Sequence, residues 1–90
     1  MKSYVKVYFK FFGYDESSWI ECECGCGQKA VDIHHLESRS IASHLLNKIE
    51  NLCAVTRLCH DRADKDRKFN SELKLKHLKK IKDSTYVQRF

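Results

Sequence analysis

Residues 30–36 read AVDIHHL, and residues 51–60 read NLCAVTRLCH. The first stretch is short, apolar and β-branched, which favours a strand with two adjacent histidines at its end. The second begins as another short apolar strand. From Arg57 to about Phe69 the pattern is polar and free of proline, as in a helix. The sequence therefore predicts two strands followed by a helix.

The segments around this centre are predicted from the spacing of their apolar residues. Residues 4–12 alternate along the chain, which predicts an N-terminal strand. Residues 38–51 look helical or loop-like. Apolar residues recur at steps of four, four and three, at Ile41, Leu45, Ile49 and Leu52. Residues 71–82 contain many lysines and predict an amphipathic basic helix, whose apolar side carries Leu75, Leu78 and Ile81.

The length of the chain, 90 residues, fits one domain, 1–90, that buries little surface and needs a staple. Three lysines interrupt the first apolar run, so no secretory signal is expected and the compartment should be reducing. Cysteines in such a compartment favour metal binding over disulfides. No apolar stretch approaches the roughly 20 residues of a membrane helix, so no membrane partner is expected.

The net charge of +5 is concentrated towards the C-terminus. Residues 65–90 contain nine Lys or Arg and three Asp or Glu, whereas residues 1–64 contain eight and nine. A basic tail over residues 69–90 suits a polyanionic partner, because neutralised phosphates release counterions. Nucleic acid is the expected partner, and an ordinary solvated face is the alternative.

Histidine and carboxylate side chains supply the candidate chemistry. Successive side chains of a strand point to opposite faces, so one of the paired histidines can hold a metal while the other holds a water. His60 and Asp64 are four residues apart, which puts both on one face of a helix, where they suit Mg²⁺, Mn²⁺, Ni²⁺ or Zn²⁺. A solvated Asp64 beside Lys65 is the alternative. Isolated histidines such as His44 and His77 are left out of the candidate site, because a lone histidine is more often a surface or satisfied core residue than a ligand.

Residues 30–39 (AVDIHHLESR) and 49–66 (IENLCAVTRLCHDRADKD) together resemble the HNH endonuclease family, particularly its small free-standing phage members. The resemblance covers residues 19–68. It implies an α+β fold of the ββα-metal, treble-clef-like kind, in which a hairpin is closed by the helix that contains His60. The same resemblance implies that the protein binds DNA in the bacterial cytoplasm. The protein would act alone, as a homodimer or in a larger phage or host complex.

The resemblance also implies roles for single residues. His35 would be the general base that deprotonates the attacking water, and His34 and His60 would bind the ion on the scissile phosphate. Asn51 would brace the loop that carries His35. Asp32 would orient an imidazole, assist the metal, or have a purely structural role. An unperturbed imidazole accepts a proton near neutral pH, which suits the first role.

The zinc site departs from the pattern of zinc-bearing relatives, which resembles Cys-x-x-Cys before the histidines and Cys-x-x-Cys-His at the helix start. Here the first half has three thiols, of which Cys22 and Cys26 fit best and Cys24 competes. In the second half Thr56 replaces a cysteine and only Cys59 remains. A four-sulfur structural zinc site then needs Cys53 or the extra thiol near Gly25. Weak or absent zinc, with thiols packed as small hydrophobes, is the alternative.

The function expected from these patterns is metal-dependent cleavage of DNA, by nicking or double-strand cutting. The alternatives are a catalytically silent, zinc-stapled nucleic-acid-binding module and a zinc finger that binds proteins. Phosphate contacts are expected from basic residues near the site and in the tail, although each of the two arginines fits a surface salt bridge nearly as well. These candidates are Arg39, Arg57, Lys76, Lys79 and Lys80.

Overall fold

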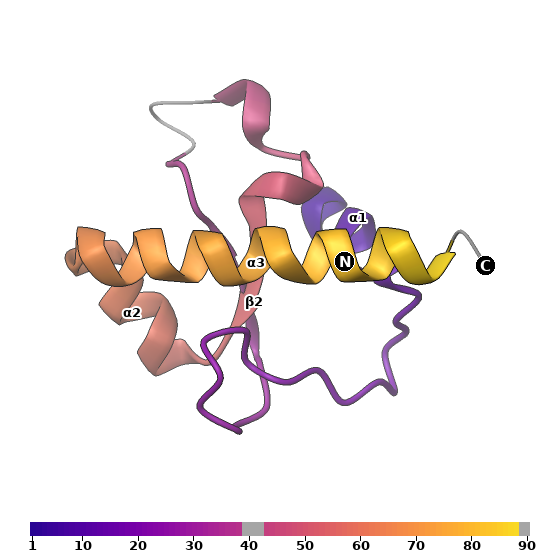
Figure 1. Cartoon of the computed structure of the whole chain (residues 1–90), viewed down its shortest axis with the longest axis horizontal. Coiled ribbons are helices and arrows are strands. Elements are labelled where there is room, and N and C mark those ends of the chain that lie inside the picture. Colours follow the sequence, from indigo (N-terminus) through magenta and orange to yellow (C-terminus); the bar gives the residue numbers. More distant parts are fainter. Residues whose placement is uncertain (39–42, 89–90) are drawn as a thin grey trace.

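The computed structural model describes residues 1–38 and 43–88, with three α-helices and a two-stranded antiparallel sheet (Figure 1). This mixture confirms the predicted α+β class. The elements follow the order α1 (Ser3–Phe12), β1 (Asp32–His35), 3₁₀ turns at Ser43–Leu45 and Ile49–Asn51, β2 (Leu52–Val55), α2 (Arg57–Lys65) and α3 (Arg67–Gln88).

The sheet forms from the two stretches that predicted it, and its register pairs Asp32 with Val55 and His35 with Leu52. Every residue of β2 is buried. Because side chains alternate along a strand, β2 contributes side chains to two hydrophobic cores. Cys53 and Val55 pack towards α2 and α3, whereas Leu52 and Ala54 pack with residues of α1.

The N-terminal segment is a helix, so the prediction of a strand over residues 4–12 was wrong. As helix α1 it places Tyr4, Val7, Tyr8 and Phe12 on one side, against the core beside β2. These spacings of three and four fit a helix as well as the alternation fits a strand, and packing decides between them. Gly13 ends α1 with a φ of 72°, a conformation that glycine adopts without strain.

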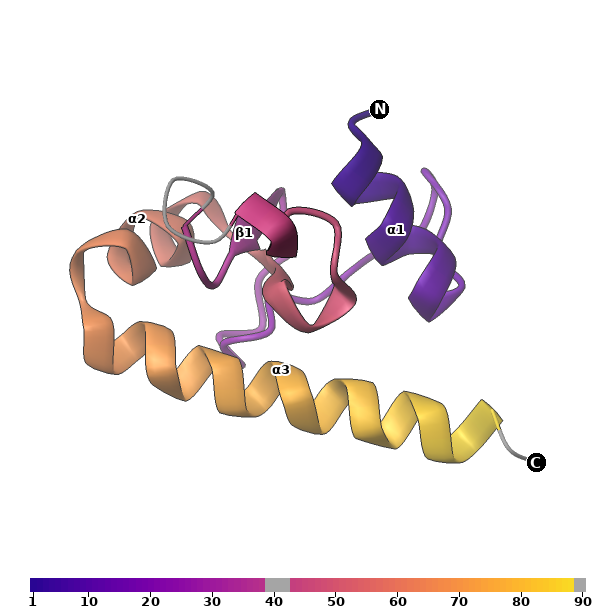
Figure 2. The ribbon, with the colours of Figure 1, turned by 90° about the horizontal axis from the view of Figure 1, so that it is seen from above.

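The helix predicted from Arg57 to about Phe69 is broken at Asp66, where the backbone is extended. Thr56 caps α2, since its hydroxyl accepts a hydrogen bond from the Cys59 N–H at 3.1 Å. The Asp66 carboxylate accepts one from the Phe69 N–H, also at 3.1 Å, and so caps the first turn of α3. The chain turns here, and α3 then runs along one side of all the other elements (Figure 2).

The predicted basic helix over residues 71–82 lies within α3, but its buried face differs from the expected one. Leu73 and His77 are almost fully buried, whereas Leu75 is 70% exposed and Leu78 is 38% exposed. The predicted stripe of residues 38–51 is formed partly by Leu45 and Ile49 in short 3₁₀ turns, and Ile41 lies outside the described residues. No described helix combines the length and apolar character that crossing a membrane requires.

Candidate metal centres

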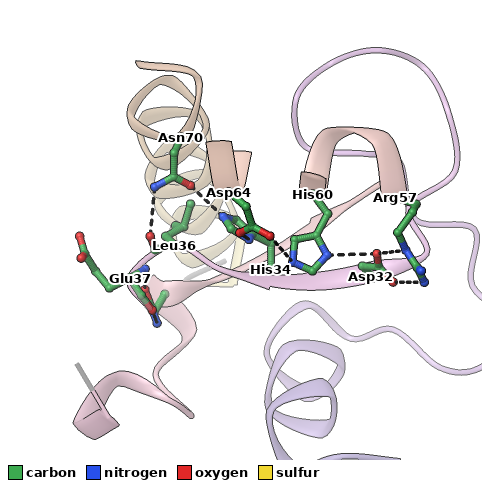
Figure 3. A network of polar contacts seen from close by, with 9 residues as sticks. Asp32, His34, Leu36, Glu37, Arg57, His60, Asp64 and Asn70 are labelled. Atoms are coloured by element: carbon green, nitrogen blue, oxygen red, sulfur yellow. Dashed lines mark hydrogen bonds and ion pairs between the residues drawn. The ribbon is translucent and has the colours of Figure 1, made fainter. Parts of the chain in front are cut away.

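Three predicted ligands meet between β1 and α2: His34, His60 and Asp64, called the histidine site below. The Nδ1 atom of His34 lies 3.7 Å from Oδ1 of Asp64, and Nε2 of His60 lies 3.9 Å from Oδ2 of the same carboxylate. All three offer ligand atoms within 4.8 Å of one another (Figure 3). Imidazole nitrogens and a carboxylate at such distances are able to share one divalent ion.

Asn70 fixes the orientation of the His34 ring. Its amide nitrogen donates to the carbonyl of Leu36 at 3.0 Å, so its oxygen faces Nε2 of His34 at 2.8 Å. An amide oxygen only accepts, which makes Nε2 the donor and leaves the lone pair of Nδ1 directed at Asp64. Asn70 was not predicted from the sequence, because it lies on another helix, 36 residues away.

Asp32 fixes the His60 ring in the same way from the other end of the site (Figure 3). Its Oδ2 atom lies 3.1 Å from Nδ1 of His60, which leaves Nε2 available for a metal. Arg57 holds the carboxylate through two hydrogen bonds of 2.6 and 3.0 Å. These bonds, with a further one from His60, hold the pKa of Asp32 below its ordinary value, so the carboxylate stays a charged acceptor.

Burial affects the charge of the His34 ring. Its side chain is 5% exposed, and loss of solvent lowers its pKa below the ordinary value of histidine. The hydrogen bond with Asn70 and the charge of Asp64 act in the opposite direction without reversing the shift. His34 is therefore neutral at neutral pH, which is the form that binds metals.

His35 and Asn51 lie beside the histidine site. The Nε2 atom of His35 is 3.1 Å from the carbonyl oxygen of Leu46, so Nε2 donates this hydrogen bond. The His35 ring also meets the edge of Tyr4 at 4.6 Å. Asn51 is buried and accepts a hydrogen bond from the Glu37 N–H at 2.6 Å, which ties the chain after β1 to the turn before β2.

A cavity of about 710 Å³ joins these groups, and it is lined by His34, His35, His60 and Asp64 as well as by residues at the start of α3. It is an open hollow between β1, α2 and α3. Its wall carries imidazole, carboxylate, amide and hydroxyl groups, which suits a polar substrate.

Four cysteines form a second group, called the cysteine cluster below: Cys22, Cys24, Cys26 and Cys59. Their sulfurs lie within 4.8 Å of one another, and the Cys24 sulfur is 3.3 Å from that of Cys22 and 3.1 Å from that of Cys59. Positive φ angles of 87° at Gly25 and 80° at Gly27 let the loop curl so that three thiols converge. The cluster could hold a metal ion such as zinc.

The surroundings of the cluster fit thiolate ligands. The backbone N–H of Thr56 donates to the Cys22 sulfur at 3.3 Å, and Lys76 donates to the carbonyl of Cys24 at 2.8 Å. Without a metal, burial and hydrogen bonds among the thiols raise the pKa of Cys24 above its ordinary value. A coordinated ion reverses this preference, because a coordinating thiol is deprotonated outright.

Cys53 lies outside the cysteine cluster, in a buried network with Glu23, His77 and Tyr8. The Nδ1 atom of His77 is 2.6 Å from Oε1 of Glu23, and its Nε2 atom is 2.6 Å from the carbonyl of Ile49. Each ring nitrogen of His77 therefore has a hydrogen-bond partner. His77 is thus a buried histidine with a partner on both sides of its ring.

Opposing effects set the charge of Glu23. Burial raises the pKa of Glu23 and is the largest single effect. The hydrogen bond and the charge of His77 lower this pKa, and so do hydrogen bonds from the Tyr8 hydroxyl and the Ala54 N–H. The net result is a pKa below the ordinary value, so the buried carboxylate is ionised.

The basic residues predicted to contact phosphate differ in whether their side chains already have interaction partners. Arg57 is held by Asp32, and Lys76 by the Cys24 carbonyl. Lys80 donates to the Tyr8 hydroxyl at 3.0 Å and lies 4.5 Å from the centre of the Phe12 ring. Lys79 is exposed, and Arg39 lies outside the described residues.

Comparisons of the chain with protein-family models, curated proteins and solved structures found no match. The resemblance to the HNH family therefore depends on the residues of the chain itself. What the geometry adds is the convergence of the histidine site, with its orienting partners, beside His35.

Proposed function

We propose that the chain is a metal-dependent phosphodiester hydrolase and, more narrowly, an HNH-type endonuclease that cuts DNA. The observation that carries the proposal is the presence of a possible metal site and a third histidine, His35, in one cavity. His34 and His60 present their lone pairs to a common point beside Asp64. His35 lines the same cavity, and its Nε2 atom donates to the Leu46 carbonyl.

The proposed mechanism divides the work between adjacent histidines. His34, His60 and Asp64 would hold a divalent ion, Mg²⁺, Mn²⁺, Ni²⁺ or Zn²⁺, against the scissile phosphate. When bound, such an ion would stabilise the negative charge that develops on the phosphate oxygens. Nδ1 of His35 would take the proton of the attacking water, since its Nε2 atom is already committed to the Leu46 carbonyl.

Asn51 and Asn70 would act through these histidines. Asn51 would hold the loop that follows His35, through its bonds to the backbone of Glu37 and Leu45. Asn70 would keep the His34 ring in the tautomer that ligates. Fixed geometry of this kind matters because a reacting water must be held within hydrogen-bond reach of its base.

The cysteine cluster would hold a structural zinc ion. Four sulfur ligands are typical of closed, tetrahedral zinc sites, and they leave no position for a substrate. The cluster joins the loop after Glu21 to the first turn of α2 through Cys59. Zinc there would fix α2, and with it His60 and Asp64, relative to the sheet.

DNA is the proposed substrate because the chain is basic and the cavity wall is polar. A chain this small has little surface for reading bases. Assembly as a homodimer or with a larger phage or host complex would decide whether one or both strands are cut. The proposed setting is the cytoplasm of a bacterial host cell.

Cleavage of supercoiled plasmid tests the proposal. Wild-type protein should nick or linearise it with Mg²⁺, Mn²⁺ or Ni²⁺ and lose this activity in chelator, and His35→Ala should be inactive. His44→Ala is the matched control, because His44 is exposed and lies outside the cavity. If all three proteins bind DNA and none cuts it with any ion, the chain is instead a catalytically silent zinc-stapled binding module.

A further inference from the structure

Arg67, the first residue of α3, lines the same cavity as the histidine site. The other charged side chains of its described lining are those of Glu37 and Asp64, apart from the histidines. Among the described lining residues, Arg67 is thus the one permanent cation. The break of the helix at Asp66 puts it there, because α3 starts beside the cavity instead of continuing the line of α2.

The guanidinium of Arg67 has no partner among the residues that the structure describes, and its side chain is exposed. The neighbouring arginines differ. Arg57 is bound to Asp32, and Arg62 lies 4.0 Å from Asp66 and 4.2 Å from the centre of the Phe69 ring. A free guanidinium on the wall of a cavity is available to a ligand.

The chemistry of this position favours an anion with several oxygens. A guanidinium has five N–H donors in a planar fork that matches two oxygens of one phosphate. It stays charged at every pH at which the protein is folded, so it adds fixed positive charge where negative charge develops during phosphodiester cleavage.

We propose that Arg67 is the phosphate-binding residue of this cavity and contacts the non-bridging oxygens of the phosphodiester that is cut. This inference rests on the proposed function, and it adds a substrate contact that the sequence pattern did not indicate. In this arrangement the scissile phosphate lies between the α3 side of the cavity, with Arg67, and the histidine site. A different role, in which Arg67 only offsets the charge of Asp64, predicts a change in metal affinity instead.

The rate of cleavage tests the proposal first. Under single-turnover conditions with saturating Mn²⁺, Arg67→Ala should cut supercoiled plasmid about 100-fold more slowly than wild type. Arg67→Lys should fall between them, because it keeps the charge and loses the fork. The control Arg62→Ala should cut at the wild-type rate. Equal rates for Arg67→Ala and Arg62→Ala, or a loss that more Mn²⁺ restores, would overturn the proposal.

A binding assay separates this inference from the proposed endonuclease activity. It uses a short DNA duplex and the Arg67→Ala or Arg62→Ala change added to His35→Ala protein. Loss of a phosphate contact should reduce the slope of log affinity against log salt by about 1 for Arg67→Ala only. If the wild-type protein does not cut at all, the salt dependence alone decides whether Arg67 contacts phosphate. A change confined to Arg67→Ala supports the phosphate contact without the nuclease, and no change rejects the contact.

Discussion

The cysteine cluster and the histidine site are both groups of possible metal ligands, and they differ in almost every physical respect. The cluster offers four soft sulfurs, three of them from one short loop. The histidine site offers two nitrogens and a carboxylate from two elements, and it borders an open cavity. Closed sulfur sites typically stabilise a fold, whereas mixed sites with an open position typically support catalysis.

The two groups also differ in what surrounds the ligands. Each imidazole of the histidine site has a hydrogen-bond partner on its far nitrogen, Asn70 for His34 and Asp32 for His60. In the cluster, Cys24 instead has other thiols as its nearest partners. Orientation of the rings does not require an ion, while thiolates packed this closely need a cation to balance their charge. We therefore expect losses at the cluster to affect folding and losses at the histidine site to affect activity.

The largest effect should follow from removing a cluster ligand. Cys24→Ser should lose bound zinc and unfold at ordinary temperature, because a structural zinc site in a small domain contributes about 10 kcal/mol or more. Cys53→Ala, in the buried network, should keep one zinc per chain and cost about 1 kcal/mol. Zinc content by mass spectrometry and thermal melting would check this. A Cys24→Ser protein that folds and melts like wild type would remove the distinction between the two sites.

A ligand change at the histidine site should abolish activity without unfolding. Asp64→Ala should reduce plasmid cleavage by more than about 100-fold, because it deletes a proposed metal ligand. Loss of an orienting partner alone typically costs about 10- to 100-fold. The Asp64 side chain is 59% exposed, so melting and zinc content should not change. Asp61→Ala, on an exposed part of α2, is the control. Unaltered cleavage by Asp64→Ala would exclude its carboxylate as a ligand.

Removing an orienting partner should have an intermediate effect. Asn70→Ala deprives Nε2 of His34 of its acceptor, so the ring loses its preferred tautomer and Mn²⁺ should bind about 10- to 100-fold more weakly. Asn47→Ala, at an exposed asparagine that accepts a hydrogen bond from Ser3, should bind Mn²⁺ as wild type does. Titration of each zinc-loaded protein with Mn²⁺ would compare them, and equal affinities would show that the Asn70 contact is unimportant for binding.

The smallest effect should be a difference in pH dependence. Burial lowers the pKa of His34, so this ligand stays neutral until the pH falls below about 6.5, the ordinary value for histidine. Burial and neighbouring thiols raise the pKa of Cys24, so protons compete there for a metal even above neutral pH. Acidification from pH 8 to pH 7 should therefore weaken Co²⁺ binding mainly at the cluster. The thiolate-to-Co²⁺ absorption would show it, and equal losses at both sites would contradict the assigned shifts.

The sheet and the histidine site were predictable because their signals are local. Alternation over residues 30–36 and the spacing of four between His60 and Asp64 each specify which side chains share a face. The orienting partners were harder, because Asn70 meets His34 only after the chain has turned at Asp66. Nothing near either residue in the sequence indicates that contact.

For physical reasons, the sequence alone could not decide two other features, the conformation of residues 4–12 and the fourth thiol of the cluster. The aromatic residues of 4–12 fit a strand and a helix equally well, and only the core beside β2 selects the helix. The fourth thiol of the cluster was also open, because Cys53 and Cys24 are both close in sequence to other candidates. The structure resolves it, since Cys24 lies in the cysteine cluster, whereas Cys53 lies in the buried network with Glu23 and His77.

We propose that one ion stabilises the fold and that a second, exchangeable ion supports cleavage. This proposal is tested most directly by preparing protein with one zinc per chain and titrating Mn²⁺ or Ni²⁺ while plasmid nicking is followed. We predict no nicking at the start and a rise that saturates as a second ion binds, with the rise absent in Asp64→Ala. Nicking by the one-zinc protein in the absence of a second ion, or none after a second ion has bound, would contradict the account.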